Sequence, residues 1–159
     1  MKFLKHKKHL RMLTDGTSDT VNLMQGSVLK DTIPDLQQIT PLIRELSEKE
    51  GVIALILFGS VARGQVKNTS DIDLCIIAGK NLPKSGRWDL LSYGSERIDV
   101  NLFWDLPVMI RFRVIQEGTI LFCRDATALH RIKVDTVRQY LDIVPLIRRH
   151  CLHAIGTKV

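Results

Sequence analysis

The 159-residue sequence is 45% hydrophobic and 25% charged, a composition typical of a globular chain long enough to bury the core of one domain. Its longest apolar run, residues 52–58, is far shorter than the roughly 20 residues of a membrane-spanning helix, so we expect no membrane role and a cytoplasmic location. The net charge of +6 belongs mainly to residues 1–14, which hold five Lys and Arg and no acid, whereas the remainder holds 18 basic and 17 acidic residues.

Residues 1–29 are predicted to form a basic N-terminal segment that precedes a single domain over residues 30–159. Residues 12–29 mix Gly, Ser, Thr and Asp without a sustained apolar period. The basic stretch 1–14 could contact nucleic acid, but Phe3 is its only aromatic side chain, and stacking on bases usually needs more. We therefore favour a solvated terminus over a nucleic-acid-binding arm.

The domain is predicted to open with a helix followed by two buried strands. Before Gly51, where the helix should end, apolar residues recur at helical spacing: Leu36, Ile39, Leu42, Ile43 and Leu46. Pro41 either kinks this helix or marks the start of its regular part. The continuous apolar runs 52–58 and 72–78 are typical of strands covered on both faces.

The second half of the domain is predicted to add two strands and two helices. Residues 97–104 alternate as a strand does, a helix should run from Pro107 to Gln116 and end at Gly118, and residues 119–123 form a short strand. One long helix over residues 125–150 should bend near Pro145. Its apolar positions are Leu129, Ile132, Val137, Leu141, Val144 and Ile147. The elements together predict an α+β domain in which helices flank a mixed sheet.

The three cysteines, Cys75, Cys123 and Cys151, form no CxxC pair. An odd number at wide spacing argues against both a disulfide framework and a zinc site. We expect them to be reduced residues that pack in the interior.

Two aspartates open the strand over residues 72–78. Asp71 and Asp73 are two apart, so both side chains should project from one face of the strand. Carboxylates so placed suit Mg²⁺, which commonly takes one or two of them together with substrate phosphates. Upstream, Gly59 and Ser60 follow a buried strand and precede a short helical turn, where backbone N–H groups and the Ser60 hydroxyl could bind phosphate. Asp99 lies on a strand that could pair beside that of Asp71.

Each of these residues also has a less specific interpretation. Asp71 alone is typical of a solvated turn residue. Asp73 instead lies inside an apolar strand, and its negative charge beside that of Asp71 is unfavourable without a cation between them. Asp105 is the alternative to Asp99 as a third acid, but it stands beside Pro107 and resembles a helix N-cap. A P-loop is excluded because Gln65 and Val66 follow the second glycine in place of Lys and Ser or Thr.

The order of "GSVARG", "SDIDL" and "RIDVNLF" resembles that of the minimal nucleotidyltransferases (MNT proteins) of the DNA polymerase beta superfamily. The resemblance covers about residues 30–150 and implies their palm-like nucleotidyltransferase fold. It implies that Gly59 and Ser60 hold the β- and γ-phosphates of ATP, and that Asp71 and Asp73 bind two Mg²⁺ ions. Asp99 would hold the metal that activates the incoming hydroxyl. Arg63 would add positive charge near the phosphates, with a surface arginine as the alternative.

The resemblance also implies a partner. Small MNT proteins are the antitoxins of HEPN–MNT toxin–antitoxin pairs, in which AMP from ATP is transferred to a tyrosine of the HEPN-type toxin. Two alternatives remain open from the sequence. One is nucleotidyl transfer to a small aminoglycoside-like molecule, for which the sequence shows no added acidic patch. The other is an antitoxin that masks its partner by binding alone.

Overall fold

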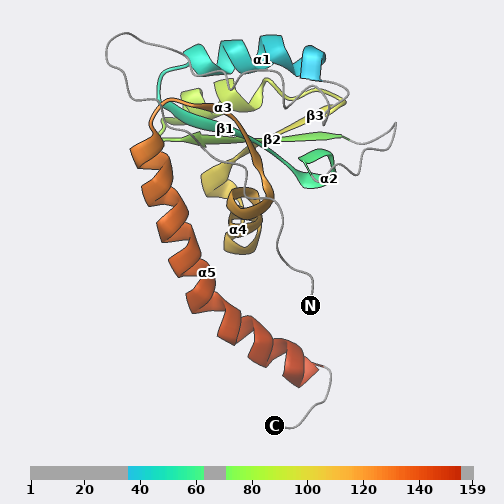
Figure 1. Cartoon of the computed structure of the whole chain (residues 1–159), viewed down its shortest axis with the longest axis vertical. Helices are drawn as coiled ribbons and strands as arrows, with labels where there is room; N and C mark the ends of the chain where they lie inside the picture. Colours follow the sequence, from blue (N-terminus) through green and yellow to red (C-terminus); the bar gives the residue numbers. More distant parts are fainter. Residues whose placement is uncertain (1–35, 63–70, 155–159) are drawn as a thin grey trace, which may run out of the picture.

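The computed structural model describes residues 36–62 and 71–154; the predicted boundary at residues 29 and 30, the basic stretch 1–14 and Arg63 lie outside the described residues. The described chain forms three layers, with α1 and α3 above a sheet and α4 and α5 below it in the view of Figure 1. The elements in order are α1 (Leu36–Glu48), β1 (Val52–Phe58), α2 (Gly59–Ala62), β2 (Ile72–Ala78), α3 (Lys84–Leu91), β3 (Ile98–Leu102), the 3₁₀ turn η1 (Phe103–Asp105), α4 (Val108–Glu117), β4 (Thr119–Cys123) and α5 (Ala126–Ala154).

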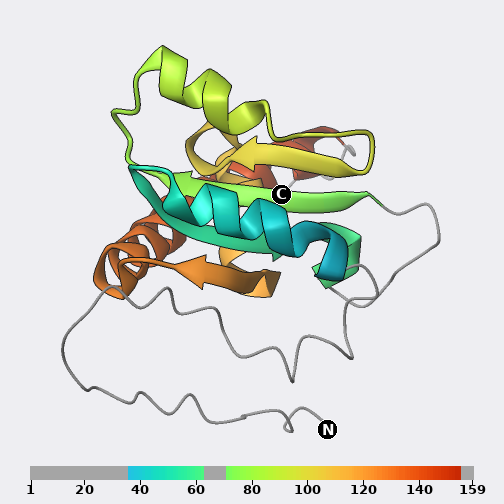
Figure 2. The same ribbon diagram turned by 90° about the horizontal axis from the view of Figure 1, so that it is seen from above.

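The sheet is mixed, as predicted. Its strands lie in the order β3-β2-β1-β4 (Figure 2). β1 is antiparallel to both β2 and β4, whereas β2 and β3 are parallel and are joined through α3. The C-terminal end of β1 therefore lies at the same edge of the sheet as the N-terminal ends of β2 and β3, which is the edge where the predicted site residues begin.

Each face of the sheet has its own apolar core. On the face covered by α1 and α3, Ile39, Ile43 and Leu46 of α1 pack on alternate residues of the strands, among them Leu74 and Val100. On the opposite face, Val114 of α4 and Leu129 of α5 pack on Cys75, Ile77 and Phe103. Both predicted buried strands, residues 52–58 and 72–78, are covered on both sides, which explains their continuous apolar sequences.

Pro41 lies inside α1, so the helix continues through the proline rather than beginning at it. The proline is on the exposed side of the helix, where water can satisfy the carbonyl group that its missing N–H leaves unpaired. α5 likewise continues through Pro145, and Figure 1 shows its axis turning in its second half. The apolar positions that the sequence marked on α5 do not all lie in the interior, because Leu141 is 61% exposed, whereas the polar Thr136 is buried.

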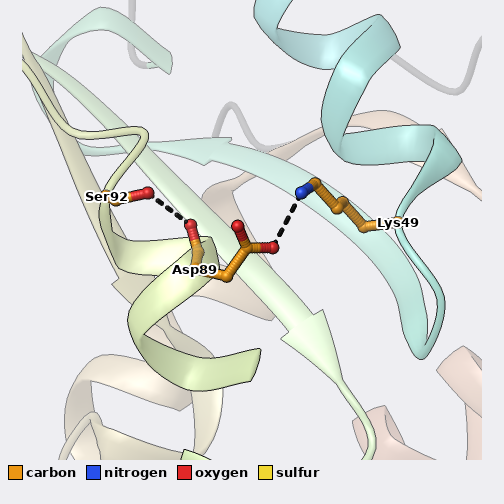
Figure 3. Close-up of polar contacts among 3 residues, drawn as sticks. All are labelled: Lys49, Asp89 and Ser92. Atoms are coloured by element: carbon orange, nitrogen blue, oxygen red, sulfur yellow. Dashed lines mark hydrogen bonds and ion pairs between the residues drawn. The ribbon is translucent and has the colours of Figure 1, made fainter. Parts of the chain in front are cut away.

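The helix α3 was not predicted from the sequence. Its residues KSGRWDLL bury only Leu90, and Trp88 is 73% exposed, so no helical apolar period is visible. A polar contact fixes α3 to α1: Lys49 Nζ donates a hydrogen bond to Asp89 Oδ2 at 2.7 Å (Figure 3). Hydrogen bonds to Asp89 and then to Tyr93 raise the pKa of Lys49, so this ammonium is charged throughout the neutral range.

Arg124, which follows β4, closes the C-terminal end of α1. Its Nη2 donates hydrogen bonds to the carbonyl oxygens of Ser47 and Lys49, and its backbone N–H donates to Ile53 O. A cation at a helix C-terminus also interacts favourably with the helix dipole. The contact joins the first helix to the last strand of the sheet.

We expect Arg124→Ala to lower the free energy of unfolding by about 1–2 kcal/mol, because a charge-assisted hydrogen bond to a part-buried carbonyl is lost. Urea unfolding measures this change. Arg113→Ala is the matched control, since Arg113 forms only an exposed pair with Glu117 at 3.9 Å, and its loss should cost under about 0.5 kcal/mol. Equal effects of the two substitutions would contradict a structural role for Arg124.

Two of the three cysteines are described and both are free. Cys75 is buried beneath α4 and α5, and burial raises the pKa of its thiol, so it is protonated at neutral pH; burial raises the pKa of the Cys123 thiol as well. The prediction of reduced packing residues is confirmed for Cys75 and Cys123, whereas the side chain of Cys151 lies outside the described residues. Within the described ranges, no helix combines the length and apolar character needed to cross a membrane.

Candidate functional site

Gly59 forms the turn between β1 and α2 and touches Asp73. Its φ of +78° is in the left-handed region, which glycine adopts without strain. A Cβ at this position would overlap the Asp73 carboxylate, lying 2.8 Å from its Cγ. The turn that carries Ser60 is therefore held directly against the Asp73 side chain, and only glycine permits the approach. The structure thus brings the predicted GS turn and the second predicted aspartate into contact.

The predicted acids share one face and one edge of the sheet. Asp73 of β2 is in register with Asp99 of β3, so their Cα atoms lie on neighbouring strands about 4.8 Å apart. Asp73 lies on the same face of the sheet as Cys75 and Ile77, and Asp99 lies on the same face as Phe103. Both carboxylates therefore project from the side of the sheet that α4 and α5 cover. Asp71 precedes β2 by one residue and is exposed, as is Asp99, whereas Asp73 is half-buried.

Asn101 is a site residue that the sequence interpretation missed. Its Nδ2 donates a hydrogen bond to Asp99 Oδ2 at 2.9 Å. The two residues are two apart on β3 and therefore on one face, so the DxN spacing was the available signal. The contact fixes the orientation of the Asp99 carboxylate and leaves its Oδ1 available to another group.

Asp105, the alternative third acid, belongs to a different part of the molecule. It lies in η1, beyond the opposite end of β3 from Asp99. Arg87 Nη2 donates hydrogen bonds to both of its carboxylate oxygens, at 2.6 and 2.7 Å. Its interpretation as a helix N-cap is wrong, because Pro107 occupies that position at the start of α4. Asp105 is therefore a structural ion-pair partner, and Asp99 stays the candidate for the third acid.

A cleft of about 460 Å³ opens beside the acids along the outer strand of the sheet. Eight residues line it: Asp71, Leu91, Gly94, Ser95, Glu96, Ile98, Asp99 and Val100. Glu96 comes from the connection between α3 and β3 and adds a third carboxylate to Asp71 and Asp99. The acidic lining is a feature that the sequence interpretation did not detect.

The donor set of this edge suits Mg²⁺, although no metal-binding group is preformed. Within residues 36–62 and 71–154, no three His, Cys, Asp or Glu side chains are gathered closely enough to hold a metal ion. Mg²⁺ usually takes one or two carboxylates together with substrate phosphates, so a complete protein cage is not required. Asp71, Asp73 and Asp99 supply the hard oxygen donors that such a shared site needs. The residues present therefore fit the ion.

Comparison with known proteins agrees with this geometry. The family described as "Polymerase beta, Nucleotidyltransferase" matches residues 40–127, which is more than half of the chain and contains all six predicted site residues. A protein of Methanocaldococcus jannaschii, named as a candidate protein adenylyltransferase, is 25% identical over 71 residues. That match covers 45% of this chain and 56% of the relative, so the chain aligns with little more than half of the relative's length.

Two solved structures share the fold. A chain of a toxin–antitoxin crystal structure with AMP-PNP superposes with a TM-score of 0.60 at 20% identity, covering 76% of this chain and 98% of that one. A chain of the complex between a tri-AMPylated Shewanella oneidensis HEPN toxin and an MNT antitoxin gives a TM-score of 0.56 at 18% identity, covering 76% and 95%. Identities this low establish the fold alone, and they confirm the predicted palm-like arrangement of a mixed sheet with helices.

Proposed function

Because this chain belongs to the polymerase beta nucleotidyltransferase family, we propose that it transfers AMP from ATP to a hydroxyl group of a protein partner. Family membership confirms the resemblance to these nucleotidyltransferases and the prediction of an enzyme. The nucleotide, the metal, the acceptor and the roles of individual residues are parts of the proposal. The contact between Gly59 and Asp73, with Asp99 in register beside Asp73, carries it, because it gathers a phosphate-binding turn and the acids at one edge.

The residues take the following roles. The Gly59 turn and the Ser60 hydroxyl bind the β- and γ-phosphates, and Arg63, outside the described residues, adds positive charge there. Asp71, Asp73 and Asp99 would hold Mg²⁺, which neutralises phosphate charge and lowers the pKa of a bound hydroxyl. Asp99, oriented by Asn101, accepts the proton of the acceptor hydroxyl at its Oδ1. The acceptor oxygen then bonds to the α-phosphorus, the bond between that phosphorus and the bridging oxygen breaks, and pyrophosphate leaves.

The proposed partner is a HEPN-type toxin and the proposed acceptor is one of its tyrosines. Three observations support this. The structures that share the fold are described as toxin–antitoxin complexes, one with AMP-PNP and one with an AMPylated HEPN toxin. The relative from Methanocaldococcus jannaschii is named for transfer of adenylyl groups to protein. The cleft beside Asp99 is open along the edge of the sheet, where a large acceptor can approach.

The proposal is tested by intact-mass spectrometry. The chain is incubated with ATP, Mg²⁺ and the HEPN-type protein encoded beside it, and we expect the partner to gain the mass of one or more AMP groups. Fragmentation should place the modification on tyrosine. EDTA should abolish the gain, since the acids alone do not activate the hydroxyl. A partner of unchanged mass, under conditions where the two proteins bind, would reject protein AMPylation.

A small cationic acceptor is the second candidate, because Glu96 joins Asp71 and Asp99 in the cleft. The aminoglycoside-like alternative lacked an acidic patch in the sequence, and the cleft provides one. Modification of such a molecule in the same assay, with the partner protein unmodified, would favour this alternative. The open position of the cleft at the sheet edge suits a protein acceptor better, since most of a small ligand's surface is normally enclosed.

A further inference from the structure

The second half of α5 carries apolar side chains that belong to neither core of the described chain. Six positions at spacings of three and four form one stripe along the part of the helix whose side chains are described: Leu129, Ile132, Thr136, Tyr140, Ile143 and Ile147. The first part of this stripe packs on the domain, where Leu129 and Ile132 join the core and Tyr140 stacks on Phe112 with ring centroids 3.7 Å apart. Beyond Tyr140, neither core cluster of the described chain contains a residue of α5.

The shape of the molecule agrees with this division. Figure 1 shows the second half of α5 extending away from the sheet and from α4, with no other labelled element beside it. Leu141 and Leu146 are 61% and 54% exposed and lie about 120° and 100° from Ile147 around the helix, on opposite sides of the stripe. They add exposed apolar surface to the two flanks of the projecting helix. A helix in water is stabilised mainly by packing of its apolar face, so a projecting helix of this composition indicates an interaction surface.

Charge decides which occupant fits the surface. The exposed residues at the far end of the described helix are Arg148, Arg149 and His150, so a complementary surface is acidic. The N-terminal segment of the chain does not meet this requirement, because residues 1–14 hold five basic residues and no acid. A second copy paired antiparallel over residues 141–154 has its two-fold axis near residue 148. Such pairing brings Arg148 of the two copies together near the axis, where their like charges repel.

We propose that residues 141–154 of α5 dock into an apolar groove, bordered by acidic side chains, on the partner protein. Helix-in-groove binding uses apolar anchors at this spacing, with Ile143 and Ile147 as the central pair and Leu141 and Leu146 at the margins. Arg148, about 100° from Ile147 around the helix, pairs with the acidic border. The surface is separate from the acids at the edge of the sheet, so binding and transfer depend on different residues. The identity of the partner rests on the proposed function, whereas the surface does not.

The test measures binding of the HEPN-type protein encoded beside this chain, without nucleotide, by calorimetry and by size exclusion with light scattering. Ile147→Glu should weaken binding at least tenfold, because it places a charge in the apolar groove and adds a like charge to an acidic surface. Pro145→Glu is the matched control: it adds the same charge to the same helix, about 160° away on the opposite side, and should change affinity less than twofold. Circular dichroism verifies that both variants fold.

A second variant tests the charge. Arg148→Glu should weaken binding at low salt and make the affinity less dependent on salt. Three results overturn the proposal: equal binding by wild type and Ile147→Glu, no binding by either, or dimerisation of the wild type that Ile147→Glu abolishes. The last would assign the surface to a second copy. A chain that binds through α5 but transfers no AMP would refute the proposed activity and leave the docking surface standing.

Discussion

Asp73→Asn should reduce AMP transfer about a thousandfold or more while leaving the fold intact. The carboxylate contacts the Gly59 turn and lies in register with Asp99, so it is the residue that joins the two halves of the proposed site. Asparagine keeps the size of the side chain and removes its charge. The transition state then loses a charged group that assists in holding Mg²⁺ and the phosphates, and losses of this kind typically cost two to three orders of magnitude or more. Initial rates with the purified partner measure the effect.

Stability provides a second measurement on the same variant. Asp73 and Asp99 bring two like charges onto neighbouring strands, so neutralising one of them should leave the melting temperature unchanged or raise it in the absence of Mg²⁺. Loss of activity without loss of stability is expected of a residue retained for function. Asp105→Asn is the matched control, since it breaks the ion pair with Arg87 and should leave the transfer rate unchanged. A Tm that falls sharply in Asp73→Asn would indicate a structural role instead.

The same variant separates catalysis from binding. If the partner toxin is still neutralised by Asp73→Asn, which retains the α5 surface, then the chain acts by masking its partner and the proposed chemistry is wrong. If neutralisation is lost while the complex still forms, transfer is the antitoxin activity. AMP transfer and partner binding therefore depend on different residues, which can be changed one at a time.

The sequence predicted the sheet and the acids because both have strong local signals. Strands covered on two faces have continuous apolar sequences, which marked residues 52–58 and 72–78, and the alternation around Asp99 marked β3. The bounds of β1, β2 and β4 agree with those expected. The pairing of β2 with β3 was expected from the position of Asp99 on the next strand, and the register places Asp99 directly beside Asp73.

Other parts of the site depend on tertiary contacts that have no local pattern. α3 buries only Leu90, so its sequence carries no period, yet it positions Leu91 and the connection that brings Glu96 to the cleft. The role of Asp105 was misjudged because its partner Arg87 lies 18 residues earlier in the chain. The exposure of Leu141 could not be read from helical spacing, because spacing does not show where a neighbouring helix ends, and α4 covers only the first part of α5.

Gly59→Ala should lower both the stability of the domain and the rate of transfer. The residue has φ of +78°, where alanine is strained, and its added methyl group would overlap the Asp73 carboxylate. Strain at a single residue of this kind costs about 1–3 kcal/mol, and relief of the overlap must move either the turn or Asp73. Displacing either separates the phosphate-binding turn from the acids, so we expect a loss of at least a hundredfold in kcat/KM.

Substitutions of two other glycines serve as controls for Gly59→Ala. Gly79 follows β2 at its opposite end, and a Cβ there would meet no atom within 4 Å, so Gly79→Ala should retain both stability and rate. Gly118 is packed on β1, where a Cβ would lie 2.5 Å from Ile56 Cγ2, so Gly118→Ala should lower stability without displacing Asp73. Measured below its melting temperature, Gly118→Ala should therefore retain most of its transfer rate. If Gly59→Ala alone of the three variants loses both stability and transfer rate, the contact between the turn and Asp73 is supported as the centre of the site. A Gly59→Ala protein with a normal transfer rate would contradict this role of the contact.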